Sequence, residues 1–181
     1  MKKRTKWIIA AAAIVLLAAL VIVILSKPVH YGRVVVIDGL EYGMTPKEVE
    51  AVLGAPDDVR DPDNTEYPKE GARYIYRLEL EGHTADVTLR FVKIAMHQEL
   101  CDVVVGVCGL EENEAEYIAE SFRNALISEY ENCEGYYCEG EEVGLNHGAI
   151  GLYCKVETDG ERVFFDGYCN DYEEYYLHLF D

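Results

Sequence analysis

Residues 43–56 are the stretch of this chain whose local fold is most narrowly set by its own sequence. Thr45 is placed as a helix N-cap, Pro46 suits the first helical position because its missing N–H costs nothing there, and Glu48 completes a capping box. Gly54 is a typical residue to end a helix, and a proline two positions later prevents its continuation. The sequence therefore predicts a short helix with one apolar stripe, formed by Val49, Val52 and Leu53.

A tight antiparallel hairpin is predicted next. Arg73–Glu81 and Thr84–Lys93 alternate apolar and polar residues around the two-residue loop Gly82-His83. We expect Glu81 to pair with Thr84, which places the apolar and aromatic residues of both strands on one face. The opposite, polar face carries Arg77, Glu79, Asp86, Thr88 and Arg90.

The rest of the chain follows a similar order of elements. A third strand is predicted over Cys101–Val107 and a second helix over Glu111–Tyr130, because apolar residues recur on one side of that helix. After a loop over Glu131–His147, strands are predicted over Ala149–Glu157, Arg162–Tyr168 and Glu174–Phe180. The sequence therefore predicts an α+β fold in which a helix followed by a three-strand antiparallel meander occurs twice. A single α+β domain of seven elements is the alternative.

The pattern G-M-T-x-x-E-V-x-x-x-L-G-x-P at residues 43–56, followed by a tyrosine-rich hairpin, resembles the SmpA/OmlA-type (BamE-like) domain of small envelope lipoproteins. The related fold occurs twice in tandem in the β-lactamase inhibitor proteins. The resemblance covers residues 37–107 and implies a non-catalytic module with a helix on a sheet. No cysteine stands near the end of the N-terminal apolar run, so lipid attachment there is excluded.

The N-terminus has the pattern of a membrane anchor. Residues 1–6 carry four basic residues, and residues 7–25 are nineteen consecutive residues without a charge, long enough to span a bilayer. The basic cluster predicts a cytoplasmic N-terminus and an extracytoplasmic domain, in a single-pass protein of the cell membrane. A buried core helix and a signal peptide cut at an atypical site are the alternatives.

These patterns predict four consecutive parts. Residues 1–26 are the basic segment and anchor, and residues 27–32 are a tether. Residues 33–109 are the BamE-like α+β unit, and residues 110–181 are a second α+β unit packed on the first.

The charge of the chain limits its partners. All 34 acidic residues lie at or beyond Asp38, and only 12 basic residues follow residue 26, which leaves that part with a formal charge of −22. Such a surface repels nucleic acid and anionic lipid. It favours a basic partner or divalent cations, or serves solubility alone.

The cysteine and histidine patterns do not indicate a metal site. The six cysteines are an even number, as in proteins with disulfides, and buried free thiols are the alternative. There is no C-x-x-C, and the five histidines are scattered singly. An EF-hand read from Asp61 has Glu66 and Ala72 where that template needs glycine and glutamate. We therefore predict no metal and no cofactor.

No catalytic constellation is visible either. The sequence has no G-x-S-x-G context and no glycine-rich phosphate loop, and with 34 acidic residues carboxylate pairs are expected by chance. We therefore predict that the protein is not an enzyme. The predicted function is a non-catalytic interaction, inhibitor or assembly module of the cell envelope. The alternative is an extracytoplasmic ion or small-ligand sensor, or an enzyme whose site is not visible in the sequence.

Tyrosines among acids suggest where a partner binds, because tyrosine is enriched at protein interfaces. Tyr136 and Tyr137 fall in the predicted loop between the second helix and the following strands. Glu79, Glu81 and Asp86 belong to the first hairpin. We predict that these residues and the sheet faces opposite the helices form a contact surface for a basic protein or peptide.

Overall fold

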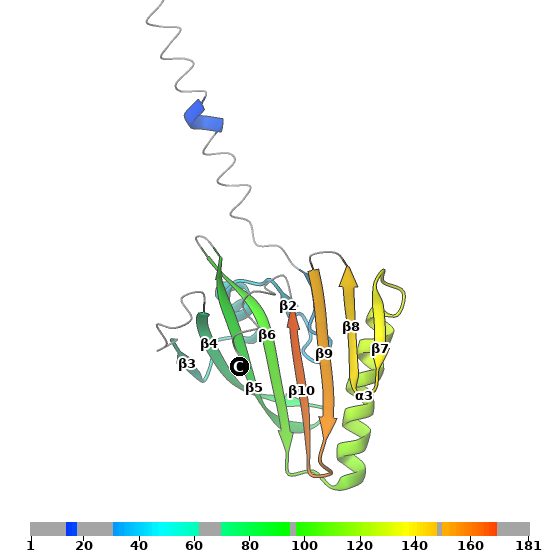
Figure 1. The fold of residues 1–181 in the computed structure, drawn as a ribbon. Helices are drawn as coiled ribbons and strands as arrows, with labels where there is room; N and C mark the ends of the chain where they lie inside the picture. The colour runs from blue at the N-terminus through cyan, green and yellow to red at the C-terminus, as the bar shows by residue number, and fades with distance from the viewer. Residues whose placement is uncertain (1–13, 18–30, 62–69, 95–96, 148–149, 170–181) are drawn as a thin grey trace, which may run out of the picture.

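The computed structural model describes residues 14–17, 31–61, 70–94, 97–147 and 150–169 (Figure 1). Its main element is one eight-stranded antiparallel sheet, with strands in the order β3, β4, β5, β6, β10, β9, β8, β7. The strands are β3 (Asp58–Arg60), β4 (Glu70–Leu80), β5 (His83–Ile94), β6 (His97–Cys108), β7 (Tyr136–Glu139), β8 (Glu142–His147), β9 (Ile150–Thr158) and β10 (Arg162–Cys169). The other elements are α2 (Pro46–Leu53), α3 (Glu112–Tyr130) and a ribbon of β1 (Gly32–Arg33) and β2 (Glu41–Tyr42).

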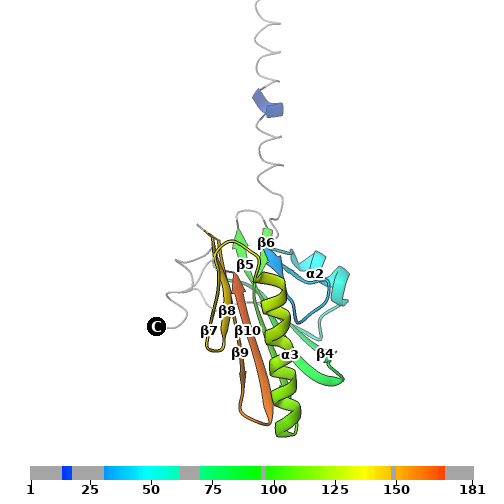
Figure 2. The same ribbon diagram turned by 90° about the vertical axis from the view of Figure 1, so that its right-hand side faces the viewer.

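Helices α2 and α3 lie on one side of the sheet (Figure 2). Helix α3 packs on β8, β9 and β10, and α2 packs on β6. The core between these layers is apolar because alternate strand residues face the helices. Fully buried members of this core are Val49, Leu89, Val103, Val105, Val107, Ile118, Leu126 and Phe165.

Helix α2 confirms the predicted capping box. The Thr45 amide donates to Glu48 Oε2 at 2.8 Å, and the Glu48 amide donates to Thr45 Oγ1 at 3.4 Å. Gly54 follows the helix with a φ of 81°, a conformation that glycine adopts without strain. Of the predicted stripe Val49 is fully buried, whereas Val52 remains 42% exposed.

The prediction of a repeated helix-plus-meander fold is wrong. Strand β10 pairs with β6 from Arg162 opposite Cys108 to Tyr168 opposite Asp102, so the strands of both halves form one sheet. The physical reason is that β6 and β10 alternate apolar residues in phase and bury one continuous apolar face. Joining them also removes two unpaired strand edges. The sheet gains further strands: β3, and β7 with β8 within the segment predicted to be a loop.

The predicted register of the first hairpin is also wrong. Leu80 pairs with His83 and Glu79 with Thr84, because the loop is Glu81-Gly82. Both loop residues have positive φ, 51° and 81°, as a type I′ turn requires. The shift from the predicted register is two residues, so each side chain remains on its predicted face.

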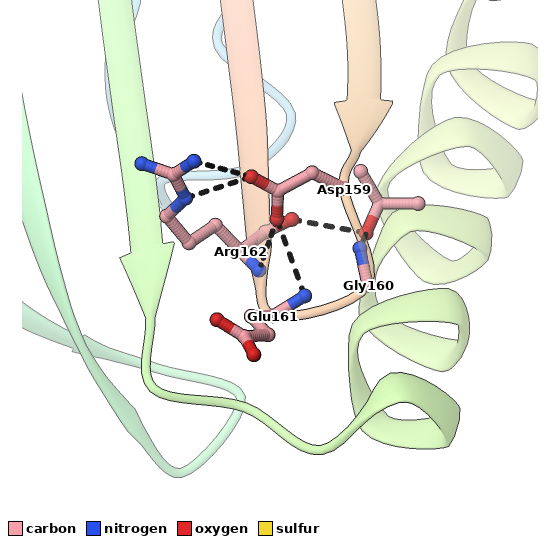
Figure 3. Close-up of polar contacts among 5 residues, drawn as sticks. Asp159, Gly160, Glu161 and Arg162 are labelled. Carbon is pink, nitrogen blue, oxygen red and sulfur yellow. Dashed lines mark hydrogen bonds and ion pairs between the residues drawn. The ribbon is translucent and has the colours of Figure 1, made fainter.

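The turn between β9 and β10 fixes the register of the central strands. The Asp159 carboxylate accepts hydrogen bonds from the amides of Glu161 at 3.2 Å and Arg162 at 3.0 Å (Figure 3). It also binds the Arg162 guanidinium, with Nε at 2.8 Å. Thr158 closes the same turn by donating to the Arg162 carbonyl. The turn therefore aligns the residues of β9 that precede it with the residues of β10 that follow it.

The prediction of a membrane anchor is corrected. Of residues 7–25 the structure describes only 14–17, and no helix in the described parts of the chain is long and apolar enough to cross a membrane. This finding contradicts the predicted single-pass anchor, on which the predicted location depends. The predicted strand at 174–180 and residues 27–30 of the predicted tether lie outside the described residues.

Candidate functional site

The strand pairings bring one residue from each of the eight strands into a row on the face opposite the helices. We call this face the helix-free face, because no helix among the described residues packs on it. Figure 1 views the sheet from this face, with α3 behind it. The row, here called the central row, consists of Arg60, Arg73, Arg90, Asp102, Tyr168, Tyr153, Gly144 and Tyr137.

The first part of the central row is its arginine end, formed by Arg60, Arg73 and Arg90 on β3, β4 and β5. Side-by-side positive charges repel each other across strands unless acids neutralise them. Arg60 Nε lies 3.0 Å from Asp58 Oδ2, and Arg90 Nε lies 2.9 Å from Asp102 Oδ2. Ion pairs therefore hold this end together.

A pair of carboxyl groups occupies the middle of the face. Asp102 on β6 and Asp166 on β10 are diagonal neighbours, because Tyr168 is opposite Asp102 and Asp166 is opposite Val104. Burial raises the pKa of Asp102 to about 7, against the opposing effect of Arg90. Burial likewise raises the pKa of Asp166. The pair is therefore prone to hold a proton near neutral pH.

One oxygen of this pair lacks a hydrogen-bond partner. Asp102 Oδ1 is buried, and no donor reaches it in the described structure. The Asp102 and Asp166 side chains are nevertheless close enough to hydrogen bond to each other. Since ionised carboxylates only accept hydrogen bonds, that bond forms only when one of them carries a proton.

The last part of the central row is its tyrosine end, formed by Tyr168, Tyr153 and Tyr137. The rings of Tyr153 and Tyr168 are stacked, with centroids 4.8 Å apart and an interplanar angle of 30°. Burial and a hydrogen bond with Glu142 raise the pKa of Tyr153. Tyr137 lies over Gly144, where an added Cβ would be 2.6 Å from its hydroxyl oxygen. Gly144 therefore makes room for the third ring.

The residues predicted as a binding surface are not brought together. Glu79 and Asp86 lie on the helix-free face of β4 and β5, and Glu81 is in their turn. Tyr137 lies on the same face, but on β7 at the other edge. Six strand spacings separate β4 from β7, about 29 Å along the sheet. Tyr136 points to the opposite face, where it packs against the core.

Sequence reasoning missed the centre of the site, namely Asp102, Asp166, Tyr153 and Tyr168. Their polar-face positions follow from the alternation of β6, β9 and β10, which the sequence shows. Their proximity depends on the pairing of β6 with β10, two strands separated by a helix and several strands in the sequence. No local signal specifies that pairing.

The described residues offer few other chemical sites. The six cysteines all lie in the described residues and form no disulfide: Cys101, Cys154 and Cys169 are buried, and Cys108, Cys133 and Cys138 are exposed. Within the described ranges, no group of three or more His, Cys, Asp or Glu side chains is placed to hold a metal ion. The carboxyl pair and its tyrosine neighbours are therefore the strongest candidate site.

Comparison of this chain with protein-family models, curated proteins and solved structures gave no match. The resemblance of residues 37–107 to the SmpA/OmlA-type domain therefore stays a prediction from sequence.

Proposed function

We propose that this protein is a non-catalytic interaction module that binds a basic segment of a partner protein on its helix-free face. The observation that carries the proposal is the central row, in which three tyrosines follow the buried Asp102 on the helix-free face of the sheet. Tyrosine rings supply contact area at low entropic cost, and they are frequent energetic centres of interfaces.

The negative charge around the tyrosine end favours a positively charged partner. Glu142 and Glu139 pair with each other on β8 and β7, and Glu157 lies on the same face of β9. The whole chain has a formal charge of −18. A positive segment is therefore attracted during encounter, and the rings provide the short-range contact.

Site-specific cross-linking tests this proposal. A photo-reactive phenylalanine is placed at Tyr153, on the helix-free face, or at Tyr117, which is 67% exposed on α3 and serves as the matched control. We expect the probe at Tyr153 to give a discrete adduct in cells and the probe at Tyr117 to give none. The adduct yield should fall between about 0.05 and 0.5 M salt, because the Debye length falls from about 14 to about 4 Å.

Two results would overturn the proposal. One is an adduct from Tyr117 and none from Tyr153, which would place the interface on the helices. The other is an adduct from Tyr153 with a partner whose contact segment is acidic.

A further inference from the structure

We infer that the Asp102–Asp166 pair is the receptor for one lysine ammonium group of the partner segment. The inference rests on the proposed function and specifies its chemistry: the cation takes the place of the proton that the two carboxyls share. Three independent features of the site point to it: an oxygen without a donor, the local balance of charge, and the neighbouring aromatic rings.

The first feature is Oδ1 of Asp102. The Asp102 side chain is only 4% exposed, and its Oδ2 accepts from Arg90 Nε at 2.9 Å. Oδ1 has no such donor in the described part of the chain. A buried carboxylate oxygen without a donor is unfavourable, so the pair needs either a proton or a cation. Asp166 is half-buried, which gives a ligand access to the pair from the helix-free face.

The second feature is the balance of charge on the surrounding strands. On β5 Arg90 compensates one of the two carboxylates, and on β4 Arg73 is the next cation along the row. On β9 Lys155 lies directly opposite Asp166, and it forms an ion pair with Glu157 on the same strand. The other titratable neighbours are two uncharged tyrosines, Tyr168 of β10 and the buried Tyr42 of β2. Because Glu157 offsets the charge of Lys155, the two carboxylates exceed the charge of Arg90 by one, which an added cation would compensate.

The third feature is the pair of stacked rings beside the carboxyls. Tyr168 is directly opposite Asp102, and Tyr153 is opposite Tyr168. A lysine carries its charge on a flexible apolar stem, which packs on aromatic rings while the ammonium reaches an acid. Ring faces also attract cations directly. The ammonium is compact and has three donors, which suits two diagonal carboxyls better than the wide fork of an arginine.

The adjoining part of the chain does not contain such a group. The twelve residues that follow Cys169 include four acidic residues and no lysine or arginine. These twelve residues therefore do not supply the cation.

The experiment is a titration of the full-length protein with Nα-acetyl-lysine N-methylamide, followed by the carboxyl carbon resonances of Asp102 and Asp166. The norleucine analogue, which has the stem without the charge, is the ligand control. The variants are Asp102→Asn and Asp166→Asn, and Asp86→Asn is the matched control because its side chain is 68% exposed and paired with Arg77. Amide spectra of every variant verify that the fold is kept.

We expect the lysine probe to bind the wild-type protein and Asp86→Asn equally, and to bind Asp102→Asn and Asp166→Asn at least tenfold more weakly. The norleucine probe should give no shift at these carboxyls. Binding displaces the shared proton, so the affinity for lysine should rise with pH up to about 7 and then level off, by at most about tenfold per pH unit. If Asp102→Asn does not fold, Asp166→Asn still tests whether the pair binds lysine, because Asp166 is only half-buried.

Several results would overturn the inference: equal binding of the lysine and norleucine probes, unchanged affinity in both Asn variants, or tighter binding of the arginine analogue. A larger response of the two carboxyls to Ca²⁺ than to the lysine probe would also overturn it, because the pair would then be a metal site. The cross-linking result distinguishes this failure from failure of the proposed function. An adduct at Tyr153 together with no lysine response keeps the interaction face and removes only this receptor.

Discussion

The two ends of the central row share one backbone pattern but are held by different forces. At the arginine end, Arg60 and Arg90 are neutralised by Asp58 and Asp102. At the tyrosine end, the rings of Tyr153 and Tyr168 stack, and Gly144 makes room for the ring of Tyr137. At the arginine end the ion pairs form within the protein, whereas the tyrosine end leaves aromatic surface beside acidic residues. We therefore place the proposed contact with a partner at the tyrosine end.

Asp102 stands where the two ends meet and takes part in both. Its Oδ2 accepts from Arg90 of the arginine end, and its buried Oδ1 has no hydrogen-bond partner in the described structure. A change at this residue therefore alters both ends, whereas a change further out alters one. Variants at Asp102, at Gly144 and at Arg60 therefore separate the contributions of the two ends.

The largest effect is expected from Asp102→Asn, measured as the pH dependence of stability. Burial raises the pKa of Asp102 from 3.8 to about 7, so the folded protein keeps a proton that the unfolded chain releases above about pH 4. The contribution to the free energy of unfolding is therefore present below pH 4 and is lost as the pH rises to about 7. The loss is at most about 1.4 kcal/mol per pH unit. Asn does not titrate, so the variant should lack this slope.

Urea unfolding at pH 4, 5, 6, 7 and 8 measures the difference between the two proteins at each pH. Relative to the wild type, Asp102→Asn should become more stable from pH 4 to 7, and the difference should then stay constant. Asp86→Asn, at an exposed position of the same face, should follow the wild type. Parallel curves for Asp102→Asn and the wild type would show that the pair holds no extra proton.

A smaller effect is expected from Gly144→Ala, which breaks the tyrosine end alone. The added Cβ would contact the Leu152 carbonyl oxygen and lie 2.6 Å from the Tyr137 hydroxyl oxygen, so a strand or a ring must move. We expect a loss of about 1–3 kcal/mol in the free energy of unfolding. The cross-linking yield at Tyr153 should fall as well.

Gly106→Ala is the matched control, on β6 of the same face. Its nearest atom, in the Phe164 ring, lies 3.8 Å from the added Cβ, which is an ordinary contact. Thermal denaturation should therefore separate the two alanine variants. Equal melting temperatures would mean that Tyr137 does not depend on the space over Gly144.

Thr45→Ala tests a region outside the central row. It removes the hydroxyl that accepts from the Glu48 amide and should lower the free energy of unfolding by about 0.5–2 kcal/mol. Because α2 lies behind the sheet, cross-linking at Tyr153 should be unchanged in the folded variant. Unchanged thermal unfolding would contradict the role of the cap, and a lost cross-link would show that the two faces are coupled.

The Thr45 cap also shows what the sequence can predict for this chain. Elements set by local signals were predicted correctly: the boundaries of α2, the helix α3, the hairpin of β9 and β10, and the face of each residue in the first hairpin. The hairpin register was wrong because Glu81 adopts a positive φ, which glutamate rarely does. Glu79 and Asp86 were placed on the correct face, but their distance from Tyr137 depends on the order of eight strands.

The centre of the site was unpredictable for the same reason. Asp102 and Asp166 lie 64 positions apart in the sequence, and each looks like an ordinary polar residue of an alternating strand. They meet because β10 pairs with β6, where the valines of one strand and the valine and phenylalanine of the other bury a shared apolar face. The pairing of β10 with β6 depends on side-chain packing over the whole sheet.

The smallest effect is expected from Arg60→Gln, at the outer limit of the arginine end. The Arg60 and Asp58 side chains are 69% and 53% exposed, and exposed ion pairs contribute about 0–1 kcal/mol because water and salt screen them. The free energy of unfolding should therefore change by less than about 0.5 kcal/mol, and less still at 0.5 M salt. Binding of the lysine probe should also be unchanged, since two strands separate Arg60 from Asp102. A tenfold change in probe affinity would mean that the arginine end tunes the carboxyl pair along the whole row, and the two ends would then have to be treated as one site.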